Sequence, residues 1–132
     1  LEVDVLAPCA LGGAVNDLSI DMIRAPIIAG AANNQLTRSH HGQMLHDKGV
    51  LYAPDYVINA GGVISVAMSG EPVEVTMERL EELGETLSAI FRQSERLDLP
   101  TSIVADKIAE KIIEEAALVE KINHAEMQKK QA

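Results

Sequence analysis

The sequence predicts an α/β fold, in which a small parallel sheet of three or so short strands with crossover helices precedes long C-terminal helices. Two observations carry this prediction. Three short apolar runs occupy the first part of the chain, and each ends in a loop of small or polar residues. From about residue 73 onward the apolar residues instead recur at three- and four-residue steps, which is the spacing of amphipathic helices.

The strands are expected within the three apolar runs, which are residues 3–13, 26–36 and 50–56. Continuous apolar runs bounded by Gly, Pro and Asn are typical of strands that are buried on both faces of a parallel sheet. Segments 17–24 and 39–49 lie between these runs and are long enough for helical or irregular crossovers. Gly49 is placed to end the second crossover.

The loops after the strands are expected to form a ligand cleft. Ligands of open parallel sheets bind at the carboxyl ends of the strands. The loops at those ends are residues 8–13, 30–35 and 53–59. We therefore expect the three loops to converge.

The second half of the chain is expected to be helical. A first helix is expected within DYVINAGGVISVA, residues 55–67, and a second over about 73–97. Pro100 interrupts the pattern because proline breaks a helix. A third helix is then expected over about 101–128.

Composition excludes several classes of protein. The net charge is −9 at pH 7, and no cluster of Lys and Arg precedes the polar end of the chain, so a nucleic-acid partner is not expected. The longest apolar run falls short of the roughly 20 residues of a membrane helix, so no membrane contact is expected. The single cysteine, Cys9, cannot form an intrachain disulfide and favours a cytoplasmic location.

Asparagines at the strand ends are the candidate ligand contacts. Asn59 lies inside an apolar stretch and is followed closely by Gly61 and Gly62, and glycines allow close approach of a ligand or another backbone. Its alternative role is to cap a helix. Asn33 and Asn34 follow the second run, where a ligand contact and a turn are equally supported. Gln35 is expected to be solvated.

Other polar residues give weaker signals. Cys9 has no basic neighbour in the sequence that activates a thiol, so a small packed residue is the favoured interpretation. The histidines at 40, 41 and 46 are separated by one, five and six residues, which does not match helical metal-ligand spacing. We therefore expect no metal, and solvated or capping roles for these side chains. The residues alone thus predict half of a ligand cleft without a catalytic base.

Four motifs point to a family. The segments DVLAPCALGG, IIAGAANNQL, GVLYAPDYVINAGGVISVA and LPTSIVADKIAEKII occur in this order. Together they resemble the carboxyl-terminal part of the glutamate/leucine/phenylalanine/valine dehydrogenase family, and within it the leucine dehydrogenases. The resemblance runs from about Val3 to about Glu115 and weakens around residues 68–75 and in the polar tail.

The resemblance implies an activity and a place in a larger chain. Enzymes of this family oxidatively deaminate an L-amino acid to a 2-oxo acid and ammonia while reducing NAD or NADP. The resemblance implies that residues 1–132 form the C-terminal half of a Rossmann-type dinucleotide-binding domain with its closing helices. The substrate domain and the glycine fingerprint are absent from this sequence, so we expect this chain alone to lack dehydrogenase activity. We expect the whole protein to be a homo-oligomer.

The resemblance also assigns roles to matching positions. Cys9, Ala10, Asn33 and Asn34 match cofactor-binding positions, and Asn59 matches the family asparagine at the junction of nicotinamide and substrate. Members of the family often carry Asp where this chain has Asn33, so the role of Asn34 is the better supported of the two. The substrate pocket is expected to be formed by Asn59, Gly61, Val63 and Val66.

The second valine bears on the substrate. Glutamate-specific members of the family carry a serine that matches Val66, and burial of a carboxylate against valine is costly. A branched-chain aliphatic substrate such as leucine, valine or isoleucine is therefore expected, and no catalytic residue is expected in this chain. The alternatives are a glutamate or phenylalanine dehydrogenase fragment, and a non-catalytic binding or oligomerisation module whose exposed sheet edges recruit a partner.

Overall fold

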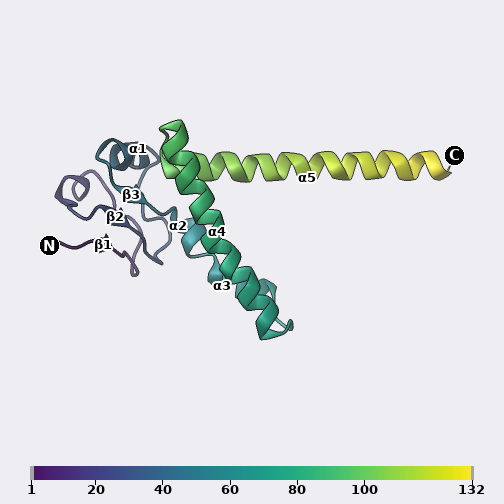
Figure 1. The fold of residues 1–132 in the computed structure, drawn as a ribbon, viewed down its shortest axis with the longest axis horizontal. Helices are drawn as coiled ribbons and strands as arrows, with labels where there is room; N and C mark the ends of the chain where they lie inside the picture. The colour runs from purple at the N-terminus through teal and green to yellow at the C-terminus, as the bar shows by residue number, and fades with distance from the viewer. Residues whose placement is uncertain (1, 132) are drawn as a thin grey trace.

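The sheet is small and parallel. The computed structural model describes residues 2–131, with side chains as far as Lys121. Strands β1 (Val5–Leu6), β2 (Ile27–Ile28) and β3 (Leu51–Tyr52) pair in parallel in the order β1-β2-β3. The predicted α/β fold with a three-stranded parallel sheet is confirmed (Figure 1). Each strand has only two residues, because the apolar runs continue into loops that bond to one another outside the ladder.

The first crossover is less helical than the second. Between β1 and β2 there is only a 3-10 turn, η1 (Ile20–Met22). Asn16 accounts for this, because its Oδ1 accepts the N–H groups of Leu18 and Ser19 and so competes with helical bonding. Between β2 and β3 lies α1 (His40–Asp47). Gly49 follows α1 with a φ of 70°, the left-handed conformation expected of a helix-terminating glycine.

The single helix expected within residues 55–67 is instead two short helices. They are α2 (Asp55–Ile58) and α3 (Gly61–Ala67). The chain leaves helical geometry at Asn59, whose φ and ψ are −94° and 4°. This break places the side chain of Asn59 between the two helices, and the site described below depends on that placement.

Two long helices complete the chain. Helix α4 (Val73–Leu97) has the bounds of the expected second helix, and α5 (Thr101–Gln131) begins at the expected residue and continues past residue 128. Asp98 between them has a φ of 53°. Figure 1 shows that α4 crosses beside the α/β body and that α5 projects away from it. In the described part of the chain no helix is long and apolar enough to cross a membrane.

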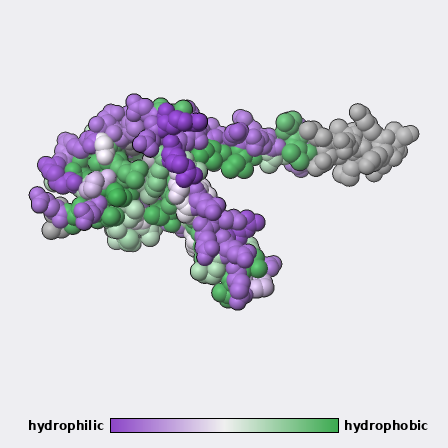
Figure 2. Space-filling model, viewed as in Figure 1, coloured by the Kyte–Doolittle hydropathy of each residue, from purple (hydrophilic) through white to green (hydrophobic). Residues whose placement is uncertain are grey.

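The core has two parts. One lies between the sheet and α1 and is formed by Val15, Ile20, Ile28, Leu45 and Tyr52. The other lies where α4 meets α5 and is formed by Ile90, Val104 and Ala105. Figure 2 shows hydrophobic patches on the near face of the α/β body and along α5, whereas α4 presents a largely hydrophilic surface in this view. The second core holds the long helices against the body.

Candidate functional site

The first two strand-end loops lie in direct contact. The N–H of Ala32 donates to the carbonyl of Pro8 at 2.9 Å, and the N–H of Gly13 donates to the carbonyl of Asn34 at 2.8 Å. A Cβ atom on Gly30 would lie only 2.2 Å from the carbonyl oxygen of Pro8. Only glycine therefore allows the two backbones to approach this closely.

The second and third loops are joined by side chains. The Nδ2 of Asn59 donates to the Oδ1 of Asn33 at 2.5 Å, and the N–H of Gln35 donates to the Oδ2 of Asp55 at 3.0 Å. The convergence of the three strand-end loops that the sequence predicts is therefore confirmed. The alternative role of Asn59 as the cap at a helix start is wrong, because Asn59 follows the last residue of α2 and no side-chain cap bond is made at the start of α3.

A hollow of about 570 Å³ lies at this junction. Its lining residues are Asn33, Asn59, Gly62, Val63, Val66 and Ala67. Val63 and Val66 lie one helical turn apart on α3 and are 73% and 76% exposed, so both present their side chains to the hollow and to solvent rather than to a core. Two amides and an apolar wall thus share one cavity.

The two glycines after Asn59 have different surroundings. A Cβ atom on Gly61 would lie 3.3 Å from Cδ2 of Leu80 on α4, whereas one on Gly62 would meet nothing within 4 Å. Gly61, which the sequence analysis expects in the substrate pocket, does not line this hollow. Gly61 allows α3 to pack on α4, and Gly62 is the glycine that lines the hollow.

Asn34 makes the turn in the second loop. Its φ of 53° lies in the left-handed region, which asparagine tolerates better than most residues with a Cβ. It lines a different hollow from Asn33, one that also contains Arg38, His40, Tyr56 and Asp106. Of the two roles considered for Asn34, the turn is the one that the backbone geometry supports.

Cys9 and Ala10 lie on the loop after β1 and are exposed. The packed position favoured for Cys9 is therefore wrong, and it is Pro8, the residue before it, that packs against Gly30. Neither residue lines the hollow beside Asn59. Both are available on the surface that adjoins the loop of Asn33.

Gln35 and Asp55 are functional candidates that sequence reasoning missed. Gln35 was expected to be solvated, yet its exposed fraction is 0%. Its Nε2 donates to the carbonyls of Gly30 and Ala32 at 2.6 and 2.9 Å. The available signal was its place at the end of the apolar run 26–36, directly before Leu36, since a polar residue within an apolar run is buried only when its hydrogen bonds are satisfied locally.

The histidines of α1 take part in a polar cluster. His40, His41 and Asp17 bring their ligating atoms within 4.8 Å of one another, although the spacing in the sequence gave no such indication. Nδ1 of the buried His41 accepts the N–H of Arg38 at 3.1 Å, so its Nε2 carries the proton and donates to Asp17 at 3.0 Å. That proton occupies the position that a metal ion would need. The bond from His41 lowers the pKa of Asp17.

The described tyrosines do not supply a base. Burial raises the pKa of Tyr52 above its ordinary value. Burial also raises the pKa of Tyr56, whose hydroxyl donates to the carboxylate of Asp106 at 2.6 Å. Both phenols therefore remain protonated at neutral pH. They act as hydrogen-bond donors or acceptors that hold neighbouring elements together.

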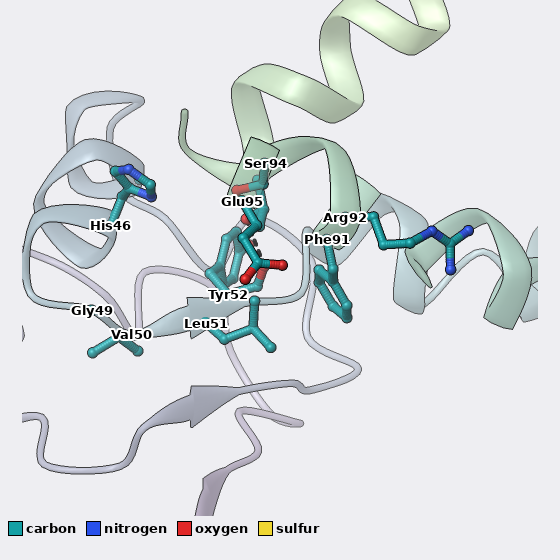
Figure 3. A pocket seen from close by; sticks show the side chains of 11 residues that line it. His46, Gly49, Val50, Leu51, Tyr52, Phe91, Arg92, Ser94 and Glu95 are labelled. Carbon is teal, nitrogen blue, oxygen red and sulfur yellow. Dashed lines mark hydrogen bonds between the residues drawn. The ribbon is translucent and has the colours of Figure 1, made fainter. Parts of the chain in front are cut away.

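Another hollow, of about 420 Å³, lies between α1, β3 and α4. Figure 3 shows Val50, Leu51 and Tyr52 beside it, with Phe91 facing them from α4 and the guanidinium of Arg92 directed outward. Its buried hydroxyls are already engaged, because Ser94 donates to Leu99 and Thr101 donates to the carbonyl of Tyr52. This hollow contains none of the site residues that the sequence predicts.

Comparison with known proteins identifies the family. The sequence profile described as "Glutamate/Leucine/Phenylalanine/Valine dehydrogenase" matches residues 1–131. The chain belongs to this dehydrogenase family. Leucine dehydrogenase of Geobacillus stearothermophilus is 46% identical over 116 residues, and valine dehydrogenase of Streptomyces albus is 43% identical over 117. L-tryptophan dehydrogenase of Nostoc punctiforme is 48% identical over 113 residues.

The dehydrogenase fold is also found in solved structures. The structure of L-tryptophan dehydrogenase from Nostoc punctiforme matches 89% of this chain with a TM-score of 0.84 and 45% identity. A hetero-hexameric glutamate dehydrogenase from Thermus thermophilus in a Leu-bound form matches 88% of the chain with a TM-score of 0.69 and 26% identity. The match to the Geobacillus enzyme covers 86% of this chain but only 32% of that enzyme. The chain therefore spans about a third of its relatives.

Proposed function

We propose that this chain is the C-terminal part of the cofactor domain of an NAD-dependent dehydrogenase that deaminates branched-chain aliphatic L-amino acids to 2-oxo acids and ammonia. Family membership supports an amino-acid dehydrogenase, and leucine and valine dehydrogenases are among its relatives. The observation that carries the proposal is the hydrogen-bonded pair Asn33–Asn59 beside an exposed wall of Val63 and Val66. We further propose that the whole protein is a homo-oligomer.

The amide pair fits a carboxamide such as that of nicotinamide. The bond between Asn59 Nδ2 and Asn33 Oδ1 leaves the Oδ1 of Asn59 and the Nδ2 of Asn33 with no partner in the described part of the chain. One acceptor and one donor remain, which is the complement of a carboxamide. Reversal of both amides leaves the same set, so the fit does not depend on how their oxygen and nitrogen atoms are assigned.

The residues of the hollow have distinct roles in this proposal. A bound nicotinamide cofactor would supply the hydride acceptor for oxidation of the substrate amine, and hydrolysis would then give the 2-oxo acid and ammonia. Asn33 and Asn59 orient the carboxamide, while Val63 and Val66 contact the aliphatic side chain and exclude water from it. The proton-transfer groups are proposed to lie in the substrate domain.

The apolar wall disfavours an acidic substrate. A carboxylate that is buried against Val66 without a partner loses several kcal/mol of solvation. L-tryptophan dehydrogenase is also a relative, so an aromatic amino acid is the second candidate substrate. The choice between an aliphatic and an aromatic side chain depends on how deep the assembled pocket is.

The test is a substrate profile of the native gene product that contains this chain. Leucine, valine, isoleucine, phenylalanine, tryptophan and glutamate are each assayed with NAD and with NADP. We expect the highest kcat/KM for a branched-chain substrate with NAD, and no turnover by residues 1–132 alone. A preference for tryptophan or phenylalanine would establish the second candidate, and absence of turnover with every amino acid would overturn the proposal.

A substitution at Val66 tests the role of the apolar wall. Val66→Ser removes methyl contacts of the kind that contribute about 10–200-fold to discrimination between side chains, so kcat/KM for leucine is expected to fall by about tenfold or more. Val75→Ser on α4 is the matched control, because Val75 is partly exposed and lies outside the hollow. An equal effect of the two substitutions would contradict the proposed contact.

A further inference from the structure

Two hydrogen-bonded connections link the second strand-end loop to the segment that contains α2. The outer connection joins Asn33 to Asn59, and the inner connection joins the N–H of Gln35 to the carboxylate of Asp55 at 3.0 Å. Asp55 begins α2, and Asn59 follows its last residue. The inner connection therefore holds together the same two segments, the second loop and α2 with the residue after it, that carry Asn33 and Asn59.

Gln35 also shapes the loop from within. Its Nε2 donates to two carbonyls of the same loop, those of Gly30 and Ala32, and its own carbonyl accepts the N–H of Val15 at 2.9 Å. The side chain is fully buried, and its Oε1 has no partner among the described residues. Burial of an unpaired amide oxygen costs free energy, so packing alone does not favour glutamine at this position.

Asp55 attaches this arrangement to the body of the fold. Its side chain is 8% exposed, and its second carboxylate oxygen accepts the N–H of Tyr56 at 3.0 Å. The hydroxyl oxygen of Tyr52 accepts the N–H of Asp55 at 3.2 Å, and Thr101 donates to the carbonyl of Tyr52 at 2.6 Å. The inner connection is thus tied to β3 and to the start of α5.

We propose that Gln35 and Asp55 are positioning residues, which hold the loop of Asn33 against α2 so that the amides of Asn33 and Asn59 meet the cofactor in a fixed geometry. This inference rests on the proposed function. Neither side chain lines the hollow, so each acts through the backbone that it holds. Loss of the inner connection to Asp55, or of the side-chain bonds that Gln35 makes within the loop, is expected to loosen the outer pair without removing any group that touches the cofactor.

The first test measures order in the loop by amide hydrogen exchange on the 132-residue chain. Gln35→Met keeps the length of the side chain and removes its donors, so faster exchange is expected at Ala32 and Gly13, whose N–H groups bond across the two loops. Ser94→Ala is the matched control, because it removes a donor to the carbonyl of Leu99 at the distant end of α4. Unchanged exchange in Gln35→Met would overturn the proposal.

The second test measures cofactor binding by the native gene product, from the fluorescence of the reduced nicotinamide cofactor. Gln35→Met removes two side-chain hydrogen bonds to the loop and is expected to raise the Kd about tenfold or more, because loss of one such bond corresponds to about three- to tenfold. Asp55→Asn places an amide nitrogen, which is a donor, against the N–H of Gln35 or of Tyr56, so it is expected to raise the Kd by at least as much. Ser94→Ala is expected to lower the Tm by a similar amount and leave the Kd unchanged, which separates positioning from general destabilisation.

The outcomes separate the inference from the function on which it rests. A native product that binds no nicotinamide cofactor overturns the proposed function. A native product that binds it, with unchanged affinity in both Gln35→Met and Asp55→Asn, overturns only the positioning role. Faster exchange in the loop together with weaker binding supports the inference, and Asp55→Asn provides that comparison if Gln35→Met does not fold.

Discussion

The backbone at Asn34 shows how much one residue of the second strand-end loop is constrained. Its φ is 53°, and its carbonyl accepts the N–H of Gly13 from the neighbouring loop. The left-handed conformation costs a residue with a Cβ about 1–2 kcal/mol, and asparagine lowers that cost by local hydrogen bonding. The requirement at this position is therefore a residue that tolerates a positive φ, rather than a particular side chain.

A pair of substitutions at this position tests the turn. Asn34→Ala is expected to lower the free energy of unfolding by about 1 kcal/mol, because alanine adopts a positive φ poorly. Asn34→Gly is expected to leave it within about 0.5 kcal/mol of the parent, because glycine adopts this φ freely. Urea unfolding of the two variants makes the comparison. Equal destabilisation by both would instead indicate a role for the amide side chain.

A second prediction concerns Asp17 and pH. The hydrogen bond from His41 holds the pKa of Asp17 below its ordinary value, so the unfolded chain takes up the proton first as pH falls. The ionised carboxylate therefore stabilises the folded chain above about pH 4, and this contribution is lost as pH falls through the lowered pKa. The free energy of unfolding of the parent should accordingly approach that of Asp17→Asn as pH falls from 6 to 3. Asp4→Asn, at an exposed carboxylate away from the histidines of α1, is the matched control.

Sequence reasoning about single residues succeeded where spacing carried the information. The three-residue step from Val63 to Val66 placed both on one face of a helix, and the structure has both beside Asn59. Gln35 was misjudged because burial of its amide depends on two carbonyls of its own loop, which no periodicity reports. The closeness of Gly61 to Leu80 of α4 could not be foreseen, because contact between two helices is a tertiary feature.

Among the elements, α4 was the easiest to predict. Its apolar residues keep a helical period over 25 residues, so its bounds follow from the sequence. The break between α2 and α3 was missed, because the apolar stretch on both sides of Asn59 has no proline and the interruption is stabilised by a contact with Asn33. The strands proved shorter than the apolar runs because loop-to-loop bonds replace the sheet ladder.

The joint between α4 and α5 gives an element-scale prediction. Ile90 is 1% exposed and packs in the second core, whereas Ile113 on α5 is 67% exposed. Ile90→Ala is expected to lower the free energy of unfolding by about 2–4 kcal/mol through the lost burial and the cavity that remains. Ile113→Ala removes the same atoms at a solvated site and is expected to change it by less than about 0.5 kcal/mol. Chemical unfolding of both variants gives the comparison.

At the scale of the whole molecule, α5 separates a packed part from an unpacked one. Its first residues, including Thr101, Val104 and Ala105, are buried against the body, whereas every residue from 109 to 121 is intermediate or exposed. Several of those exposed side chains are apolar, among them Ile112, Ile113, Leu118 and Val119. The described part of the chain does not bury this stretch.

Truncation tests that division. Removal of residues 112–132 is expected to leave the free energy of unfolding of the 132-residue chain within about 0.5 kcal/mol, because stability comes from buried contacts rather than from an unpacked helix. Far-UV circular dichroism should lose helical signal at the same time. A marked fall in the urea midpoint would show that the outer part of α5 is covered, most simply by a second copy of the chain. Sedimentation of both forms would detect that copy.

The left-handed residue Asp98 has a mechanical consequence. Helix α5 has 31 residues, which at 1.5 Å per residue makes a rod of roughly 46 Å. A rotation of one degree about the turn at residues 98–100 therefore displaces the distal end by roughly 0.8 Å. The bond from Ser94 to Leu99 and the contact of His46 with Asp98 restrain the turn before α5. The position of the distal end of α5, and of any surface that it contacts, therefore depends on these few atoms at the start of the helix.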